Sequence, residues 1–392
     1  MKAPRESDFW PDLIRFCQKL IQTPSASGHE GEVAELVQAE MQKLGYDEIW
    51  IDRVGNVIGL VKGDRDKPSI CFTAHMDTVP CDDESKWEYP PYSGVIAEGY
   101  VHGRGAGDVK GPLAMQVYVP RLLRESDVKH GDIYVVEVVQ EEVGGLGSKH
   151  LDDDVKDEID YAINGEPTSN RIHIGQRGRT ELVVTLKGKS AHASRPWQGK
   201  NPFYDMAKFI LKLENLKMTR YDEIESTVVP TLCKTDTETS NVIPGECRLV
   251  LDWRDVPIES EAYIMKTMRA LLPESGEVQI AEYELKTYTG LTFQMKRRKL
   301  PFSIGENHPL VKTVAQAVRS ALGKEAEIGW WEGATDCGYF AAAGIPIIGF
   351  SPSESKYSHT TRERISLQLM KEALECYPAI ISDISKLKKR KS

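Results

Sequence analysis

The stretch IYVVEVVQEEVGG, from Ile133 to Gly145, joins an apolar run to two adjacent carboxylates. The run from Ile133 to Val139 is short and ends close to glycine, a pattern that is typical of a buried β-strand. After Gln140, Glu141 and Glu142 follow this run. Two like charges at the end of a buried strand repel each other unless a cation or a shared proton holds them together. The stretch therefore predicts a strand that delivers a charged site to the edge of a sheet.

Three other segments have the same construction, an apolar run followed by polar residues. The runs are Ile70 to Phe72, Tyr161 to Ile163 and Ile345 to Phe350, and they lead to TAHMDT, NGEPT and, through a polar loop, SHT. Such runs indicate buried parallel strands. Ligands of open α/β sheets collect beyond the carboxyl ends of the strands. We therefore expect one site that contains His75, Asp77, Glu142, Glu166 and His359.

A glycine-rich loop, GRGAGDVKGP from Gly103 to Pro112, adds Asp108 to this site. Pro112 suits the first turn of a helix. The loop lacks the Lys-Ser/Thr ending of a phosphate-binding P-loop, and Asp108 stands where a GxGxxG motif needs its last glycine. The sequence therefore disfavours a nucleotide site.

The 392 residues include 50 basic and 59 acidic side chains, which gives a formal net charge of −9. This length is typical of two domains, and the acidic balance argues against a nucleic-acid partner. Seven cysteines without a C-x-x-C pair indicate reduced thiols. Charges within the first eight residues, and the lack of 18 consecutive apolar residues, favour a cytoplasmic protein that does not contact a membrane.

The order of the elements predicts a domain that is interrupted by another. A helix begins after a capping box of Ser27 and Glu30 and ends at Gly45. Strands and helices then alternate to about residue 175, which predicts a largely parallel sheet. From Thr180 the order becomes βαββαβ, with a last strand from Val278 to Leu285, which indicates a ferredoxin-like α+β insertion. We expect a catalytic α/β domain of residues 1–178 and 291–392, with the insertion at 179–290.

Seven motifs occur in a fixed order: TAHMDTVP, GRGAGDVKG, QEEVGG, NGEPT, GKSAHAS, GATDCGYF and SHTTRERI. Together they resemble the dinuclear zinc aminoacylase/carboxypeptidase family, which includes acetylornithine deacetylase, succinyl-diaminopimelate desuccinylase and bacterial glutamate carboxypeptidase. The likeness extends from His75 to Glu363. The motif with Glu332, Gly333 and Ala334 departs from the more common double glycine of the family, which leaves the substrate open.

The resemblance implies two zinc ions per chain. Asp108 would bridge them, with His75 and Glu166 on one ion and Glu142 and His359 on the other. One imidazole and carboxylates on each ion, with a position left for water, are typical of catalytic zinc. Oxygen-rich ligands do not select zinc strongly, so cobalt, manganese or a single metal remain alternatives.

The resemblance also implies roles for residues that are not metal ligands. Glu141 would be the general base, and His192 would reach across a homodimer, formed by the insertion, to the substrate carbonyl. Asp77, two residues after His75 on the same strand face, would accept the second N–H of that histidine. A free carboxylate on a small substrate would be bound by Asn241 and Arg254, with Arg177 as a helper, since the arginine fork matches a carboxylate. Gly333, Thr335 and Asp336 would form the pocket floor.

Together with the resemblance, these residues imply a metal-dependent amide hydrolase that removes the acyl group of an N-acyl amino acid. A dipeptidase or carboxypeptidase is the alternative within enzymes. The alternative that is not an enzyme is a relative that binds a ligand without catalysis. The presence of Glu141 argues against this alternative, because metal binding alone needs only Glu142.

Overall fold

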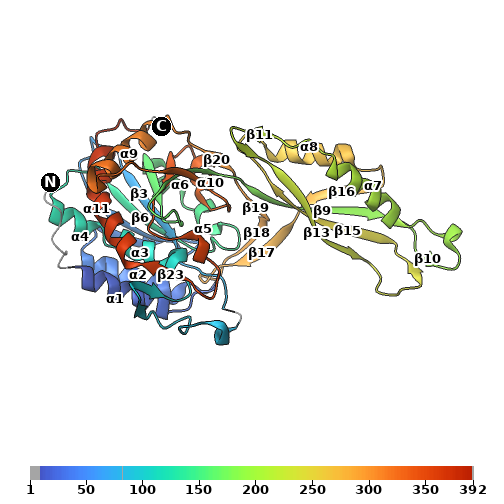
Figure 1. The fold of residues 1–392 in the computed structure, drawn as a ribbon, viewed down its shortest axis with the longest axis horizontal. Helices are drawn as coiled ribbons and strands as arrows, with labels where there is room; N and C mark the ends of the chain where they lie inside the picture. The colour runs from blue at the N-terminus through green and yellow to red at the C-terminus, as the bar shows by residue number, and fades with distance from the viewer. Residues whose placement is uncertain (1–8, 82, 391–392) are drawn as a thin grey trace.

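The computed structural model describes residues 9–81 and 83–390. Residues 1–8, whose charges enter the expectation of a cytoplasmic protein, lie outside the described residues. The chain forms a large α/β part, at the left of Figure 1, and a narrower part that extends from it to the right. In the described ranges, no helix has the length and apolar character that would be needed to cross a bilayer.

The α/β part is built on a nine-stranded sheet, counted over the described residues, with the order β1-β2-β6-β3-β7-β22-β8-β20 and with β21 paired to β8. The four central strands β6, β3, β7 and β22 run parallel, whereas β2 and β8 pair with their inner neighbours in the antiparallel sense. The strands are β1 (Glu48–Ile51), β2 (Val57–Val61), β3 (Ile70–His75), β6 (Ile133–Val138), β7 (Tyr161–Asn164), β8 (Ile172–Gln176), β20 (Phe302–Ser303), β21 (Ile328–Trp331) and β22 (Ile347–Gly349). The four strands predicted from apolar runs are therefore confirmed as parallel neighbours.

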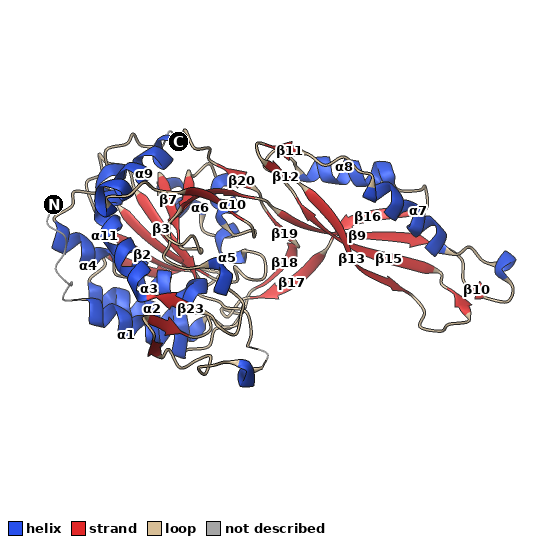
Figure 2. Cartoon of the chain, in the orientation of Figure 1, coloured by secondary structure: helices blue, strands red, loops and turns tan. Residues whose placement is uncertain are grey.

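Helices cover both faces of this sheet, which explains why its strands are apolar on both sides (Figure 2). In β3, Ile70 and Phe72 point to one hydrophobic cluster and Cys71 to the other. The first cluster includes residues of α1 (Trp10–Gln22), α2 (Gly31–Leu44), α3 (Gly111–Val117), α4 (Val119–Ser126), α9 (Pro309–Leu322) and α11 (Leu367–Ile384). The second includes residues of α6 (Asp153–Glu158) and α10 (Cys337–Ala342), and α5 (Leu146–Lys149) contacts α10.

The predicted capping box before α2 is wrong, although the predicted end of the helix is confirmed. Gly45 ends α2 in the left-handed conformation, as the sequence indicates. Glu30 is the N-cap and makes no side-chain cap hydrogen bond. Ser27 instead donates its hydroxyl to the Asp77 carboxylate at 2.6 Å. A buried carboxylate just after β3 thus competes successfully with the local cap.

The narrower part has its own antiparallel sheet with the order β13-β15-β9-β16, to which β19 adds by pairing with β9. Its elements are β9 (Arg179–Lys187), α7 (Pro202–Glu214), β13 (Thr227–Thr235), β15 (Glu246–Arg254), α8 (Glu261–Leu271), β16 (Gly276–Ile280) and β19 (Arg298–Lys299). This order confirms the predicted βαββαβ insertion. Residues of α7 and α8 pack on the alternate buried side chains of β9 and β15.

Two details of the insertion differ from the expectation. The strand predicted from Val278 to Leu285 is divided: β16 ends at Ile280, and β17 (Glu282–Lys286) pairs with β18 (Thr292–Lys296) in a separate hairpin. Strand β19 joins the inserted sheet although it lies after residue 290. The exact division into domains at residues 178 and 290 stays a prediction.

Several short strands pair outside the two main sheets. β4 (Ile96–Ala97), β5 (Tyr100–His102) and β23 (Arg364–Ser366) form a small sheet. β11 (Arg220–Tyr221) pairs with β12 (Ile224–Glu225), and β10 (Ala191–His192) pairs with β14 (Val242–Ile243). Figure 1 shows β10 near the end of the inserted part that is remote from the large sheet.

Candidate metal centre

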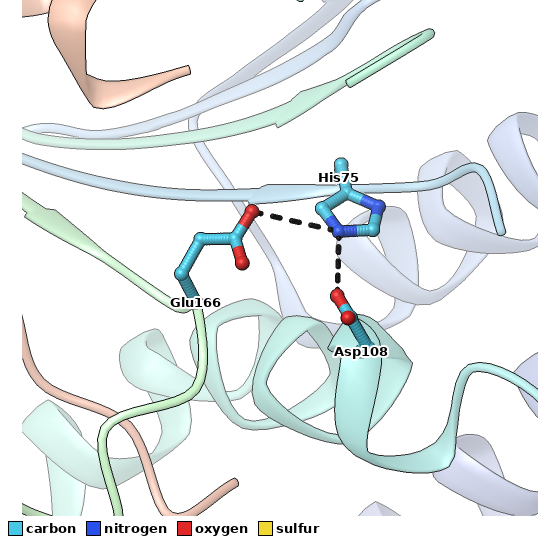
Figure 3. A group of neighbouring side chains, drawn as sticks. All are labelled: His75, Asp108 and Glu166. Atoms are coloured by element: carbon cyan, nitrogen blue, oxygen red, sulfur yellow. Dashed lines mark hydrogen bonds and ion pairs between the residues drawn. The ribbon is translucent and has the colours of Figure 1, made fainter. Parts of the chain in front are cut away.

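Polar side chains from separate segments meet beyond the carboxyl ends of the parallel strands. His75 is the last residue of β3, Glu166 follows β7, and Asp108 lies in η2 (Ala106–Lys110), an irregular helical turn directly before α3. The Nε2 atom of His75 is 3.1 Å from Oδ1 of Asp108 and 3.7 Å from Oε1 of Glu166 (Figure 3). These three residues could hold one metal ion, because each offers a ligand atom to a common point.

A second group shares Asp108 with the first. The Nε2 atom of His359 is 3.0 Å from Oε2 of Glu142 and 3.4 Å from Oδ2 of Asp108. Asp108 thus presents one carboxylate oxygen to each imidazole. The structure brings together all five residues that the sequence suggested as ligands, in two groups that are joined by one aspartate.

Burial and charge show that these residues fit a bound cation. Burial raises the pKa of Glu166 well above its usual range, and the charges of Glu141 and Asp108 raise it further. Burial and the Asp108 charge also raise the pKa of Glu142. Burial acts to raise the pKa of Asp108, but the hydrogen bond and charge of His75 lower it overall. Ionised carboxylates this close need positive charge between them, and imidazole with carboxylate oxygens suits borderline divalent ions.

Asp77 holds the segment that carries Glu141 and Glu142. Its carboxylate accepts the backbone N–H of Glu141 at 2.9 Å and that of Glu142 at 3.2 Å. The Nδ1 atom of His75 is 2.8 Å from the main-chain carbonyl oxygen of Asp77, whereas the carboxylate is 3.6 Å away. Asp77 therefore contacts the histidine through its main-chain oxygen, while its carboxylate bonds to the neighbouring loop, and its orienting role stays a prediction.

The turn after β6 requires glycine at two positions. Gly144 has φ of 137° and Gly145 has φ of 73°, a region that side chains disfavour. A Cβ atom at Gly145 would lie 2.7 Å from the ring of Tyr339. The tight turn brings Glu141 and Glu142 back over the end of the strand, next to the two histidines.

Lys299 is the main residue of the site that sequence reasoning missed. Its Nζ atom is 2.5 Å from Oε1 of Glu141 and 3.1 Å from the carbonyl oxygen of Ala334. Burial acts to lower the pKa of Lys299, but the charge of Glu141 raises it overall. A lysine within the basic run KRRK gives no local signal of such a role, since basic runs are usually solvated.

A cavity of about 590 Å³ opens onto both groups. It is lined by Asp108, Glu141, Glu142, Glu166 and His359, together with Lys299 and the segment from Trp330 to Thr335. Gly333 and Thr335 thus lie where the sequence suggested a pocket floor. Asp336 is buried next to them, and it accepts the Ser148 hydroxyl and the Asn164 amide. Burial and the Glu141 charge raise the pKa of Asp336 to about 6.

The remaining predicted residues lie in the inserted part or near its base, outside this cavity lining. His192, in β10, is exposed at the remote end, and the Asn241 carbonyl accepts the Ala193 N–H beside it. Arg254 ends β15 and donates to Asp252 at 2.6 Å. Arg177 contacts the main-chain oxygen of Glu225 at 3.4 Å. Within the single described chain, these residues do not join the two ligand groups.

Comparison with known proteins finds relatives over most of the chain. The model of Peptidase family M20/M25/M40 matches residues 71–383. The Escherichia coli (strain K12) protein YgeY is 27% identical over 370 residues, which cover 92% of this chain and 91% of that protein. A succinyl-diaminopimelate desuccinylase of Halorhodospira halophila is 25% identical over 386 residues, which cover 95% of this chain and 97% of that enzyme.

Solved structures show the same fold. A crystal structure of a tripeptidase from Staphylococcus aureus matches with a TM-score of 0.77 and 22% identity, over 96% of this chain and 98% of that chain. The family match covers most of the sequence and includes all five clustered residues. The chain therefore belongs to Peptidase family M20/M25/M40 and is a metal-dependent hydrolase of C–N amide bonds.

Proposed function

We propose that this protein removes the acyl group of an N-acyl amino acid by hydrolysing the amide bond next to a free carboxylate. The observation that carries the proposal is the pair of ligand groups that share Asp108 at the edge of the cavity. One metal ion would be held by His75, Asp108 and Glu166. A second would be held by Asp108, Glu142 and His359. Zinc is the ion we propose for both positions.

Bound divalent ions would supply polarisation of the amide carbonyl and would favour the ionisation of a water molecule. Glu141 lines the cavity beside the ligand groups, and its backbone N–H donates to the Asp77 carboxylate. In our proposal it accepts the proton of the attacking water and delivers it to the leaving amine. The substrate amide is thereby divided into a carboxylate and an amine.

The inserted part would complete the site from a second copy of the chain. His192 and Asn241 lie together near its remote end, and in our proposal the partner's insertion carries them to the substrate. Exposed apolar side chains on α7 and on the edge strand β13 support this pairing: Phe203, Tyr204, Leu211, Val229 and Leu232. An unpaired strand edge is a ready surface for a second copy. Arg254, with Arg177 as a helper, would bind the substrate carboxylate.

The first experiment is an amine-release assay over N-acetyl and N-succinyl amino acids and simple dipeptides, each with zinc, cobalt or manganese. Acyl amino acids should be the better substrates. Preference for dipeptides would instead indicate the peptidase alternative, and the absence of metal-dependent release from every substrate would contradict the proposal.

Glu141→Gln tests the role of the base in the same assay. The variant should keep the metal content of the wild type and lose about 10²–10⁴-fold in kcat, because it lacks a group that accepts the proton. Glu158→Gln, at the exposed end of α6, is the matched control and should keep full activity. Undiminished hydrolysis by Glu141→Gln would refute the assignment.

A further inference from the structure

Two connections join the large sheet to the inserted sheet, and they lie side by side. The outgoing connection runs from β8 through Gly178 into β9, and the return runs from β19 into β20. Strand β19 pairs with the start of β9, with Lys299 opposite Arg179, while β20 pairs with β8. Lys299 therefore belongs by hydrogen bonding to the inserted sheet, three residues before the chain re-enters the large one.

The ammonium of Lys299 reaches from this junction into the cavity. It contacts the Glu141 carboxylate at 2.5 Å and the Ala334 carbonyl oxygen at 3.1 Å. The side chains are 16% and 5% exposed for Lys299 and Glu141, so water screens this ion pair little. Two acceptors from different segments fix the position of the ammonium, and the ammonium in turn fixes one oxygen of Glu141.

The turn that carries Glu141 is held from the same side by two tyrosines. The Tyr339 hydroxyl lies 3.0 Å from the carbonyl oxygens of both Gly144 and Arg298, so it bridges the turn and β19. The Tyr283 hydroxyl, from β17, donates to the carbonyl oxygen of Val143. The junction between the sheets thus contacts the turn directly through Lys299 and indirectly through Tyr339, whose hydroxyl lies between the Arg298 and Gly144 carbonyl oxygens.

We propose that Lys299 is a positioning residue for Glu141, and that it makes the placement of this carboxylate depend on the junction between the two sheets. The proposal rests on the proposed function, in which Glu141 moves the proton. Arg298 anchors the same strand from the other side, because its guanidinium is 3.0 Å from the Asp255 carboxylate of the inserted part. A change in the angle between the sheets would therefore be transmitted to Glu141 through one short strand.

The kinetic test uses Lys299→Met, Lys299→Arg and the control Lys296→Met. Lys296 lies in the same return segment but pairs with Glu261 at 2.6 Å on the surface. Lys299→Met should lower kcat about 10- to 100-fold while KM changes less than about threefold, since a misplaced base affects the chemical step more than binding. Lys299→Arg, which keeps the charge, should regain part of kcat, and Lys296→Met should match the wild type.

Three kinetic results would overturn the proposal. They are an unchanged kcat in Lys299→Met, an effect confined to KM, which would make Lys299 a substrate-binding residue, or equal losses in Lys296→Met. Wild type and Glu141→Gln are assayed in parallel. If the wild type is inactive, the proposed function is contradicted. If the wild type is active, Glu141→Gln is inactive and Lys299→Met is fully active, only the role of Lys299 is contradicted.

Thermal unfolding of the metal-free protein, prepared with a chelator, gives a readout that does not depend on activity. Lys299→Met should lower the melting temperature because it leaves Glu141 buried without its partner. The double variant Lys299→Met/Glu141→Gln should recover most of this loss, and additive changes would overturn the coupling. If the single variant Lys299→Met does not fold but the double variant does, the coupling is established. If neither the single nor the double variant folds, Lys299 is structural and the proposal fails.

Discussion

At the scale of single residues, two buried carboxylates that are not ligand candidates hold the backbone of the turn after β6. Asp77 accepts the N–H groups of Glu141 and Glu142, and Glu30 accepts those of Gly28 and Gln140. Both carboxylates are fully buried. The turn is therefore fixed by hydrogen bonds to carboxylates, which are stronger than bonds between neutral groups when the carboxylate is ionised. The consequence is that two acidic side chains are buried against this turn.

Glu30→Gln should change how stability depends on pH. Burial and the charge of Asp77 raise the pKa of Glu30 from 4.5 to about 7. The folded state therefore binds this proton more tightly than the unfolded state, so the stability it contributes is complete below about pH 4.5 and is lost as pH rises through 7. Glutamine keeps an acceptor for both N–H groups and carries no charge.

The measurement is denaturant unfolding at pH 4.5, 6 and 8. The free energy of unfolding of Glu30→Gln, relative to that of wild type, should increase by on the order of 3 kcal/mol from the lowest to the highest pH. The reason is that the pKa of Glu30 rises from 4.5 to about 7 on folding. Each pKa unit of this difference corresponds to ~1.4 kcal/mol. A constant difference between the two proteins would show that Glu30 does not titrate in this range.

At the scale of elements, the turn between β6 and α5 combines a demanding backbone with close packing. Gln140, Gly144 and Gly145 all have positive φ, and the N–H groups of Gly144 and Gly145 bond to carbonyl oxygens of Glu141 and Gln140. Gly145 also lies against Tyr339 and Asp336 of the α10 segment. A side chain at position 145 would therefore disturb the turn that carries Glu141 and Glu142.

Gly145→Ala should destabilise the protein more than Gly323→Ala. Both glycines have a similar φ, 73° and 67°, but a Cβ at Gly323 would meet nothing within 4 Å. Gly323→Ala should cost about 1 kcal/mol for the left-handed backbone alone, and Gly145→Ala about 1–3 kcal/mol more for the displaced Tyr339 ring. Urea unfolding measures both, and equal losses would mean that the contact with Tyr339 does not restrict the turn.

At the scale of the whole molecule, the elongated shape separates the residues that the proposed reaction needs. The ligand groups lie at the edge of the large sheet, whereas β10 with His192 lies near the remote end of the insertion (Figure 1). In a symmetric pair of chains, the insertion of each chain could reach the ligand groups of the other, because a twofold axis gives both partners the same contacts. The proposed site therefore requires two copies.

Mixing two inactive variants tests this requirement. His192→Ala and Glu141→Gln should each abolish most activity, whereas chains unfolded together and refolded should regain about one quarter of wild-type activity, since half of the random pairs are mixed and one of their two sites is intact. Light scattering checks that dimers form. Activity that stays at the level of the separate variants would place His192 outside the partner's site.

Much of this arrangement could be predicted from the sequence because its signals are local. Apolar runs of strand length identify β3, β6, β7 and β22, and the polar residues that follow each run identify His75, Glu142 and Glu166. The carboxyl ends of parallel strands share one edge, so convergence follows from strand direction alone. The order βαββαβ of the insertion is equally a property of periodicity along the chain.

Only the tertiary structure decided the contacts between segments that are distant in sequence. Lys299 binds Glu141, which is 158 positions away in the sequence. Ser27 donates to Asp77, which is 50 positions away, instead of capping the helix. The contact of Asp77 with His75, through the main chain, also depends on which donors compete for its carboxylate. Local pattern determines which residues reach the sheet edge, whereas partner choice among buried charges depends on packing and burial in the folded chain, which no window of sequence contains.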